Sequence, residues 1–205
     1  MKELSPLEID ALTEIINIGV GRAANSLNDI IGTHIQLKVP RIELFPLEKL
    51  NELLGRLGHA NVTTVMQSFK GEFTGSAALL FPPESTRRLI SSLTGEPVKN
   101  VAAIADEGRS TLMEIGNIVI NCILGTMGNI LECSMDFSLP QFRTIKNPVD
   151  LLAGSGLNEQ GAGFIILAEA NFYIKALEVT GYIFIFFKID SFEILTRMIN
   201  RAVSR

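Results

Sequence analysis

The 205-residue sequence has few of the residues on which much enzyme chemistry depends. It contains two His, two Cys and no Trp. Cys122 and Cys133, with two His elsewhere, do not have the ligand spacing of a tetrahedral zinc site. Two Cys are also too few for a disulfide scaffold, so we interpret both thiols as small buried hydrophobes in a reducing compartment. With so few His, we expect no Ser-His-Asp or Cys-His catalytic set.

The sequence also lacks a concentration of positive charge. Eighteen Lys and Arg stand against 22 Asp and Glu, which gives a formal net charge of −4. No stretch gathers basic residues, so we expect neither nucleic acid nor an anionic membrane as a partner. The apolar fraction of 47% excludes a disordered chain.

No hydrophobic run has the roughly 20 residues that cross a bilayer. Tyr182 to Phe187 is an uninterrupted run of strand length, and Ile115 to Met127 contains Asn117 and Asn121. The N-terminus has no apolar signal region. We therefore expect a cytoplasmic protein without membrane insertion.

The first helix is predicted by its start signal. Ser5-Pro6-Leu7-Glu8 supplies a capping Ser, a Pro at the first helical position and a Glu three residues after the cap. Residues 9–18 then have helical periodicity. We expect Gly19 and Gly21 to loosen or break the helix, and residues 22–31 to resume it up to a C-cap at Gly32.

The pattern of this helix returns one hundred residues later. Leu12 to Ile18 aligns with Leu112 to Ile118, and the Glu and the Asn of the first segment recur at the same places in the second. A strand-like segment, Phe73 to Phe81, resembles Val179 to Phe187, and a helical pattern follows each. We interpret the chain as an internal duplication whose seam lies near residues 96–105.

These patterns predict an α+β fold. Two halves of the form helix–helix–strands–helix, about residues 1–100 and 101–205, share one sheet with pseudo-two-fold symmetry in a single domain. The segment from His34 to Phe45 is also β-like, and its Pro40 belongs at a strand end or edge. The other expected strands are residues 71–81, 163–168 and 178–189.

Two glycine-rich segments and both His have a structural interpretation. Gly19 to Ala24 has the G-x-G-x-x-A spacing of a dinucleotide site, but it follows a helix where that site requires a strand. Gly154 to Gly163 lacks the Lys-Ser/Thr of a P-loop and is expected to be a loop. His34 and His59 are expected to be structural or exposed.

A polar stripe is the remaining candidate for chemistry. Its spacing of i, i+4 and i+7 places three side chains on one helix face in each half. The simpler interpretation is a solvated face. However, the Glu and the Asn recur at the same two places in both halves. Asn is a mediocre helix former, so helix propensity does not explain its presence there. The stripe residues are Asp10, Glu14 and Asn17 in the first half, and Ser110, Glu114 and Asn117 in the second.

A Glu and an Asn one turn apart suit a narrow set of tasks. The carboxylate can pair with a Lys or an Arg, and the carboxamide can both donate to and accept from a water molecule. Neither group is an activated nucleophile. The pair could position a water for attack on a labile bond, as the Gln of GTPases does, with the metal and the electrophile supplied by a partner.

The two stripes and their following prolines resemble a known signature. Asp10-x3-Glu14-x2-Asn17-x22-Pro40, and its counterpart from Ser110 to Pro140, are similar to the Asp/Ser-x3-Glu-x2-Asn-x22-Pro pattern of the CheC/CheX/FliY phosphatases. The run from Asn17 to Ala24 is most similar to CheC.

The resemblance implies hydrolysis of the aspartyl phosphate on CheY, the response regulator of chemotaxis. Glu14 and Glu114 would dock on a Lys of the receiver domain, and Asn17 and Asn117 would orient the attacking water. The chain would need no cofactor of its own, because the receiver would hold the Mg²⁺. The supporting motif positions would be Asp10, Pro40, Ser110 and Pro140.

The chain departs from the family pattern in places. Arg22 stands where relatives often have Asn, and Val119-Ile120-Asn121 replaces the Gly-x-Gly run in the second half. Unequal activity of the two sites is therefore expected. No motif decides whether the chain binds CheD. The alternative function is a non-enzymatic adaptor, similar to a flagellar-switch protein, that binds CheY or CheD.

Overall fold

The computed structural model describes residues 4–31, 34–56, 61–95, 97, 104, 106–147, 150–151, 163–174 and 177–204. The helices in these ranges are α1 (Pro6–Ile31), η1 (Leu47–Lys49), α2 (Leu50–Arg56), α3 (Pro83–Thr94), α4 (Asp106–Leu131) and α6 (Ile189–Val203). The strands are β1 (Ile35–Pro46), β2 (Val62–Gly71), β3 (Gly75–Phe81), β4 (Met135–Phe137), β5 (Gln141–Ile145), β6 (Gly163–Ile174) and β7 (Leu177–Lys188).

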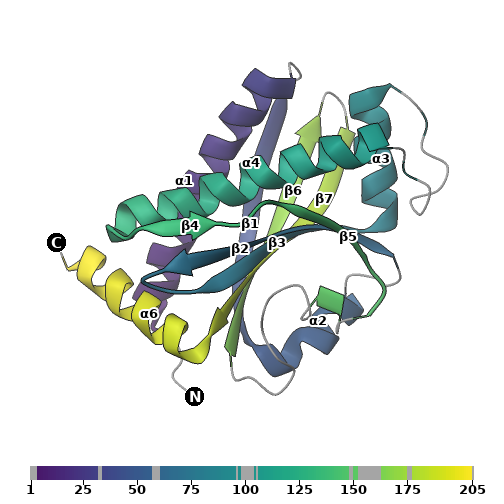
Figure 1. The fold of residues 1–205 in the computed structure, drawn as a ribbon. Coiled ribbons are helices and arrows are strands. Elements are labelled where there is room, and N and C mark those ends of the chain that lie inside the picture. Colours follow the sequence, from purple (N-terminus) through teal and green to yellow (C-terminus); the bar gives the residue numbers. More distant parts are fainter. Residues whose placement is uncertain are drawn as a thin grey trace.

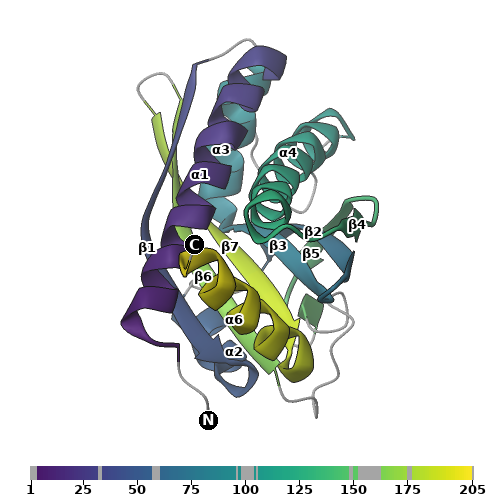
Figure 2. The same cartoon turned by 90° about the vertical axis from the view of Figure 1, so that its left-hand side faces the viewer.

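The described strands form one antiparallel sheet that is covered on both faces. Figures 1 and 2 show α1, α3, α4 and α6 on one side of the sheet and α2 on the other. The larger apolar core lies between the four helices and the sheet, and a smaller one lies under η1 and α2. This arrangement confirms the predicted α+β fold.

The two halves exchange their edge strands. The sheet order is β1-β6-β7-β3-β2-β4, and β5 also pairs with β2. The hairpins β2–β3 and β6–β7 therefore lie side by side at the centre. β1 from the first half pairs with β6 from the second, and β4 and β5 from the second half pair with β2 from the first. Each hairpin is thus extended at its outer edge by strands from the opposite half.

The register of the central strands is symmetric. Ala78 and Phe184 occupy the same place in the aligned segments 73–81 and 179–187. In the sheet these two residues are paired across β3 and β7. A residue that pairs with its own counterpart marks the position of a two-fold axis, so the shared sheet has the predicted pseudo-symmetry. The expected seam near residue 100 lies mostly outside the described residues.

Helix α1 starts as the sequence predicts. The backbone N–H of Glu8 donates to Ser5 Oγ at 3.3 Å, and the backbone N–H of Ser5 donates to Glu8 Oε2 at 2.6 Å, which is a capping box. Asn200 on α6 donates to the other oxygen of Glu8 at 2.6 Å. The cap therefore also joins the two ends of the chain.

The expected break at Gly19 and Gly21 is wrong, because α1 is continuous from Pro6 to Ile31. A Gly inside a helix costs about 1 kcal/mol relative to Ala. At Gly19 close packing offsets that cost, since a Cβ there would lie 2.6 Å from Ile123 Cα on α4. Gly19 thus lets the two long helices approach each other, and Gly32 lies outside the described residues.

Most strand predictions are confirmed, with two corrections. The segments predicted at 178–189 and 163–168 are β7 and β6, and β6 extends to Ile174. The segment 71–81 is not one strand, because β2 ends at Gly71 and β3 begins at Gly75. β2 itself was not predicted. Its side chains are buried on both faces over most of its length, so it shows no polar–apolar alternation.

Helix α4 is long and apolar enough, by length and composition, to cross a membrane. In the described structure, 61% of its most apolar window is buried inside the protein. Gly116 on this helix packs directly on Val65 of β2, where a Cβ would lie 2.5 Å from the Val side chain. The apolar composition of α4 is therefore explained by its contacts with the sheet and with α1.

Two glycines of α1 provide a matched test of the helix contact. Gly19→Ala should lower the free energy of unfolding by about 1–3 kcal/mol, because the new methyl group overlaps the backbone of α4. Gly21→Ala should raise it by about 0.5–1 kcal/mol, because a Cβ there has no atom within 4 Å. Urea unfolding of both variants measures the difference. Equal stability of the two variants would contradict the close contact.

Candidate functional site

The stripe on α1 lies on the outer side of the helix. Asp10, Glu14 and Asn17 are exposed, while Leu12, Ile15 and Ile16 between them are buried. No described residue forms a hydrogen bond or an ion pair with the three polar side chains. Asp10 and Glu14 are one turn apart, so their charges repel each other weakly. A cation on a binding partner would relieve that repulsion.

The stripe on α4 has a different environment. Ser110 and Glu114 are exposed, but Asn117 is half-buried. Asn117 Oδ1 accepts a hydrogen bond from Asn121 Nδ2 at 2.8 Å and another from Gln67 Nε2 at 3.2 Å. The helix contributes Asn121, and the neighbouring strand β2 contributes Gln67.

The orientation of these amides follows from a backbone carbonyl. Gln67 Nε2 also donates to the carbonyl oxygen of Ser138 at 3.0 Å. A carbonyl can only accept, so the group of Gln67 that faces Ser138 is its NH₂. The same NH₂ faces Asn117, which must therefore present its oxygen to Gln67. Both acceptor positions of Asn117 Oδ1 are thus occupied. We call the four linked residues, Asn117, Asn121, Gln67 and Ser138, the Asn117 network.

Both motif prolines lie where an edge strand is irregular. The register of β1 against β6 shifts between Lys38 and Arg41, around Pro40. Pro140 lies between β4 and β5, just after Ser138 of the Asn117 network. A Pro removes a ladder hydrogen bond, so it is tolerated at an edge or a bulge, as predicted for Pro40.

Apolar side chains are exposed beside the second stripe. Leu139 is 85% exposed and Phe137 is 38% exposed, and both flank Ser138. The residues one hundred positions earlier, Leu37 and Val39, are half-buried. The second stripe therefore adjoins a small apolar surface that the first stripe does not have in the same place.

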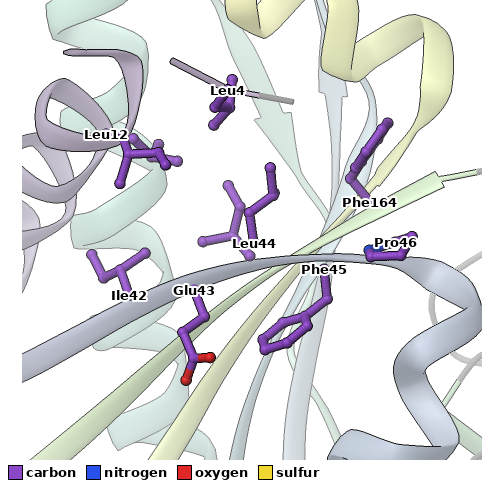
Figure 3. Close-up of a pocket in the computed structure, with 10 residues that line it drawn as sticks. Leu4, Leu12, Ile42, Glu43, Leu44, Phe45, Pro46 and Phe164 are labelled. Atoms are coloured by element: carbon purple, nitrogen blue, oxygen red, sulfur yellow. The ribbon is translucent and has the colours of Figure 1, made fainter. Parts of the chain in front are cut away.

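A cavity of about 420 Å³ lies between the first turns of α1, strand β1 and Phe164. Its lining is apolar except for Glu43. Figure 3 shows the Glu43 side chain on the opposite side of β1 from Leu44. The cavity therefore lacks the converging polar groups that a catalytic pocket needs.

The described residues contain no group of three or more His, Cys, Asp and Glu that could hold a metal ion. Burial, with a smaller contribution from Glu72, raises the pKa of the Cys133 thiol, so the thiolate is disfavoured at neutral pH. His34 is exposed, and His59 lies outside the described residues, as does most of the glycine-rich segment 154–163.

Sequence reasoning missed Gln67 and Ser138, and it treated Asn121 only as a departure from a glycine pattern. A signal for Gln67 was present, since it is the one amide in an otherwise apolar and hydroxyl-bearing run from Val62 to Phe69. Its partners are distant in sequence. Only the pairing of β2 with the second half brings Ser138 to it.

Comparison with known proteins relates the chain to one family. A sequence model described as CheC-like family matches residues 7–44. CheC1 of Halobacterium salinarum is 26% identical over 133 residues, which are 65% of this chain and 67% of that protein. The CheY-P phosphatase CheC of Bacillus subtilis is 24% identical over 136 residues, 65% of each chain. The chain thus spans about two thirds of the length of these relatives.

The fold is shared more widely than the sequence. FliY of Thermotoga maritima superposes with a TM-score of 0.75 at 17% identity, over 98% of this chain and 100% of that one. At this identity the likeness concerns the fold alone. The motif of the first helix, two sequence relatives and the fold agree, so the resemblance of this chain to the CheC/CheX/FliY family is confirmed.

Proposed function

We propose that the protein is a phosphatase that hydrolyses the aspartyl phosphate of a CheY-type response regulator in chemotaxis signalling. The observation that carries the proposal is the pair of outward-facing Glu-Asn stripes, on α1 and α4, within a chain whose sequence relatives include a CheY-P phosphatase. The substrate is a phosphorylated receiver domain, and the place of action is the cytoplasm.

The two residues of each pair have separate roles. Glu14 and Glu114 are exposed and have no described ion-pair partner, so they are available to a Lys of the receiver domain. Asn17 and Asn117 would reach the acyl phosphate and orient a water molecule. That water attacks phosphorus, the bond from phosphorus to the aspartyl oxygen breaks, and inorganic phosphate and a free carboxylate result.

The chemistry is divided between the two proteins. An aspartyl phosphate is already labile, so positioning of water is the main contribution that remains for the phosphatase. Mg²⁺ would belong to the receiver domain and neutralise charge on the phosphoryl group. The supporting motif positions would be Asp10, Ser110, Pro40 and Pro140. CheD is the candidate for a second partner.

An adaptor that binds a receiver domain without hydrolysis is the second candidate. The fold of FliY fits it equally well, because a shared fold does not specify activity. Catalytic turnover separates the two functions: an adaptor would protect or sequester the phosphorylated receiver but would not shorten the life of its phosphoryl group.

Removal of the two stripe amides tests their role in orienting water. Asn17→Ala combined with Asn117→Ala should lower kcat for loss of aspartyl phosphate by about a hundredfold or more, because the water is no longer oriented. Phosphate release from a purified CheY-type receiver domain measures it. Asn25→Ala combined with Asn129→Ala is the matched control, since both are exposed amides on the same two helices. Full activity of the Asn17/Asn117 variant would refute the proposed function.

Removal of the two stripe carboxylates tests their role in docking. Glu14→Gln combined with Glu114→Gln should raise KM for the phosphorylated receiver about two- to fivefold, because each exposed ion pair contributes at most about 1 kcal/mol. The difference from wild type should shrink as salt is added, since salt screens exposed charges. Asp29→Asn combined with Glu193→Gln removes two exposed carboxylates elsewhere and should leave KM unchanged. A rise in KM that does not change with salt would argue against electrostatic docking.

A further inference from the structure

The two candidate sites differ in the freedom of their amides. Asn17 is exposed and forms no hydrogen bond with a described residue. Asn117 is half-buried and accepts two hydrogen bonds in the Asn117 network. The shared scaffold does not require this difference, so it must come from the residues around each Asn.

The corresponding residues around Asn17 cannot form such a network. Gly21 lies one hundred residues before Asn121 and has no side chain. Gln67 pairs with Ala77 in the sheet, and Ala168 pairs with Ile183. Ala77 and Ile183 occupy the same place in the aligned segments 73–81 and 179–187. The position of Gln67 is therefore filled by Ala168 in the other half.

The occupied oxygen affects what Asn117 can do. A side-chain amide directs a water toward an electrophile by accepting a hydrogen bond from it, which leaves a lone pair of the water free to attack. Asn117 Oδ1 has two lone pairs, and Gln67 and Asn121 use both. Asn17 Oδ1 is available for this task, whereas Asn117 must first give up one of its hydrogen bonds.

We propose that Gln67 and Asn121 restrain Asn117, so that the second site hydrolyses slowly and Asn17 carries most of the turnover. This inference rests on the proposed function. Gln67 acts through Asn117 and is a positioning residue; it does not need to contact the substrate.

The burial of Gln67 is an independent observation in favour of such a role. Gln67 is 2% exposed, and its Oε1 has no hydrogen-bond partner in the described part of the structure. A buried polar atom without a partner destabilises a fold. The matching position accommodates Ala168 in an apolar core, so packing alone does not require an amide here.

The test releases Asn117 in a protein whose first site is disabled. In the Asn17→Ala background, Gln67→Met removes one donor and keeps the side-chain volume. Asn121→Ala removes the other donor at a half-buried position. Each should raise kcat for phosphate release from a phosphorylated CheY-type receiver domain about tenfold, because one lone pair of Asn117 becomes free. KM should not change, since the docking carboxylate Glu114 is not altered.

Three controls make the outcome specific. Gln141→Met is the same substitution on the adjoining strand β5, outside the Asn117 network, and should have no effect. Adding Asn117→Ala to the Gln67→Met or the Asn121→Ala variant should abolish the gain in kcat. In otherwise intact protein, Asn17→Ala should cost more activity than Asn117→Ala.

The result that overturns the inference is an unchanged or lower kcat in both the Gln67→Met and the Asn121→Ala variants, because the network would then leave Asn117 unhindered or hold it productively. A failure of the proposed function is recognised separately. In that case neither Asn17 nor Asn117 would matter for hydrolysis, and no variant of Gln67 would change it.

Discussion

The close contact between the two long helices is the constraint on which both candidate sites depend. Gly19 allows the backbone of α1 to approach Ile123 of α4, and Gly116 allows α4 to approach Val65 of β2. Helices held this tightly by backbone contacts have a fixed rotation about their axes. Consequently the apolar stripe of each helix faces the core, and the polar stripe with its Glu and its Asn faces outward. A side chain at Gly19 would push α1 away from α4, and one at Gly116 would push α4 away from the sheet.

The exchange of edge strands brings residues of both halves to each candidate site, so the two candidate sites have different surroundings. Helix α4 lies over the β2–β3 hairpin of the first half and over β4 and β5 of the second half. The surroundings of Asn117 therefore combine β2 of the first half with Ser138 of the second. Substitutions such as Gln67 for Ala and Asn121 for Gly can alter one site and leave the other unchanged. A duplicated fold thus permits one site to retain a free amide while the other acquires a network.

The elements with strong local signals were predictable from sequence, and contacts between distant segments were not. The capping box at Ser5 and Glu8, the outward stripes and strand β7 follow from local spacing alone. The uninterrupted course of α1 through Gly19 depends on α4, which lies a hundred residues away, so local propensity gave the wrong answer. Strand β2 was missed because burial on both faces removes the alternation that marks a strand. Gln67 could not be placed beside Asn117 from sequence either, because the two residues are distant in the chain and only the folded structure brings them together.

Under the proposed function, the chain would contribute a carboxylate for docking and an amide for water, and the receiver domain would contribute the labile bond. The proposed function is catalysis, as distinct from binding. It is tested most directly by mixing a small amount of the protein with an excess of phosphorylated CheY-type receiver domain and counting the phosphate released per molecule of protein. A phosphatase should complete many turnovers, with a rate that grows in proportion to the protein added. Release no faster than the spontaneous decay of the receiver alone would contradict it.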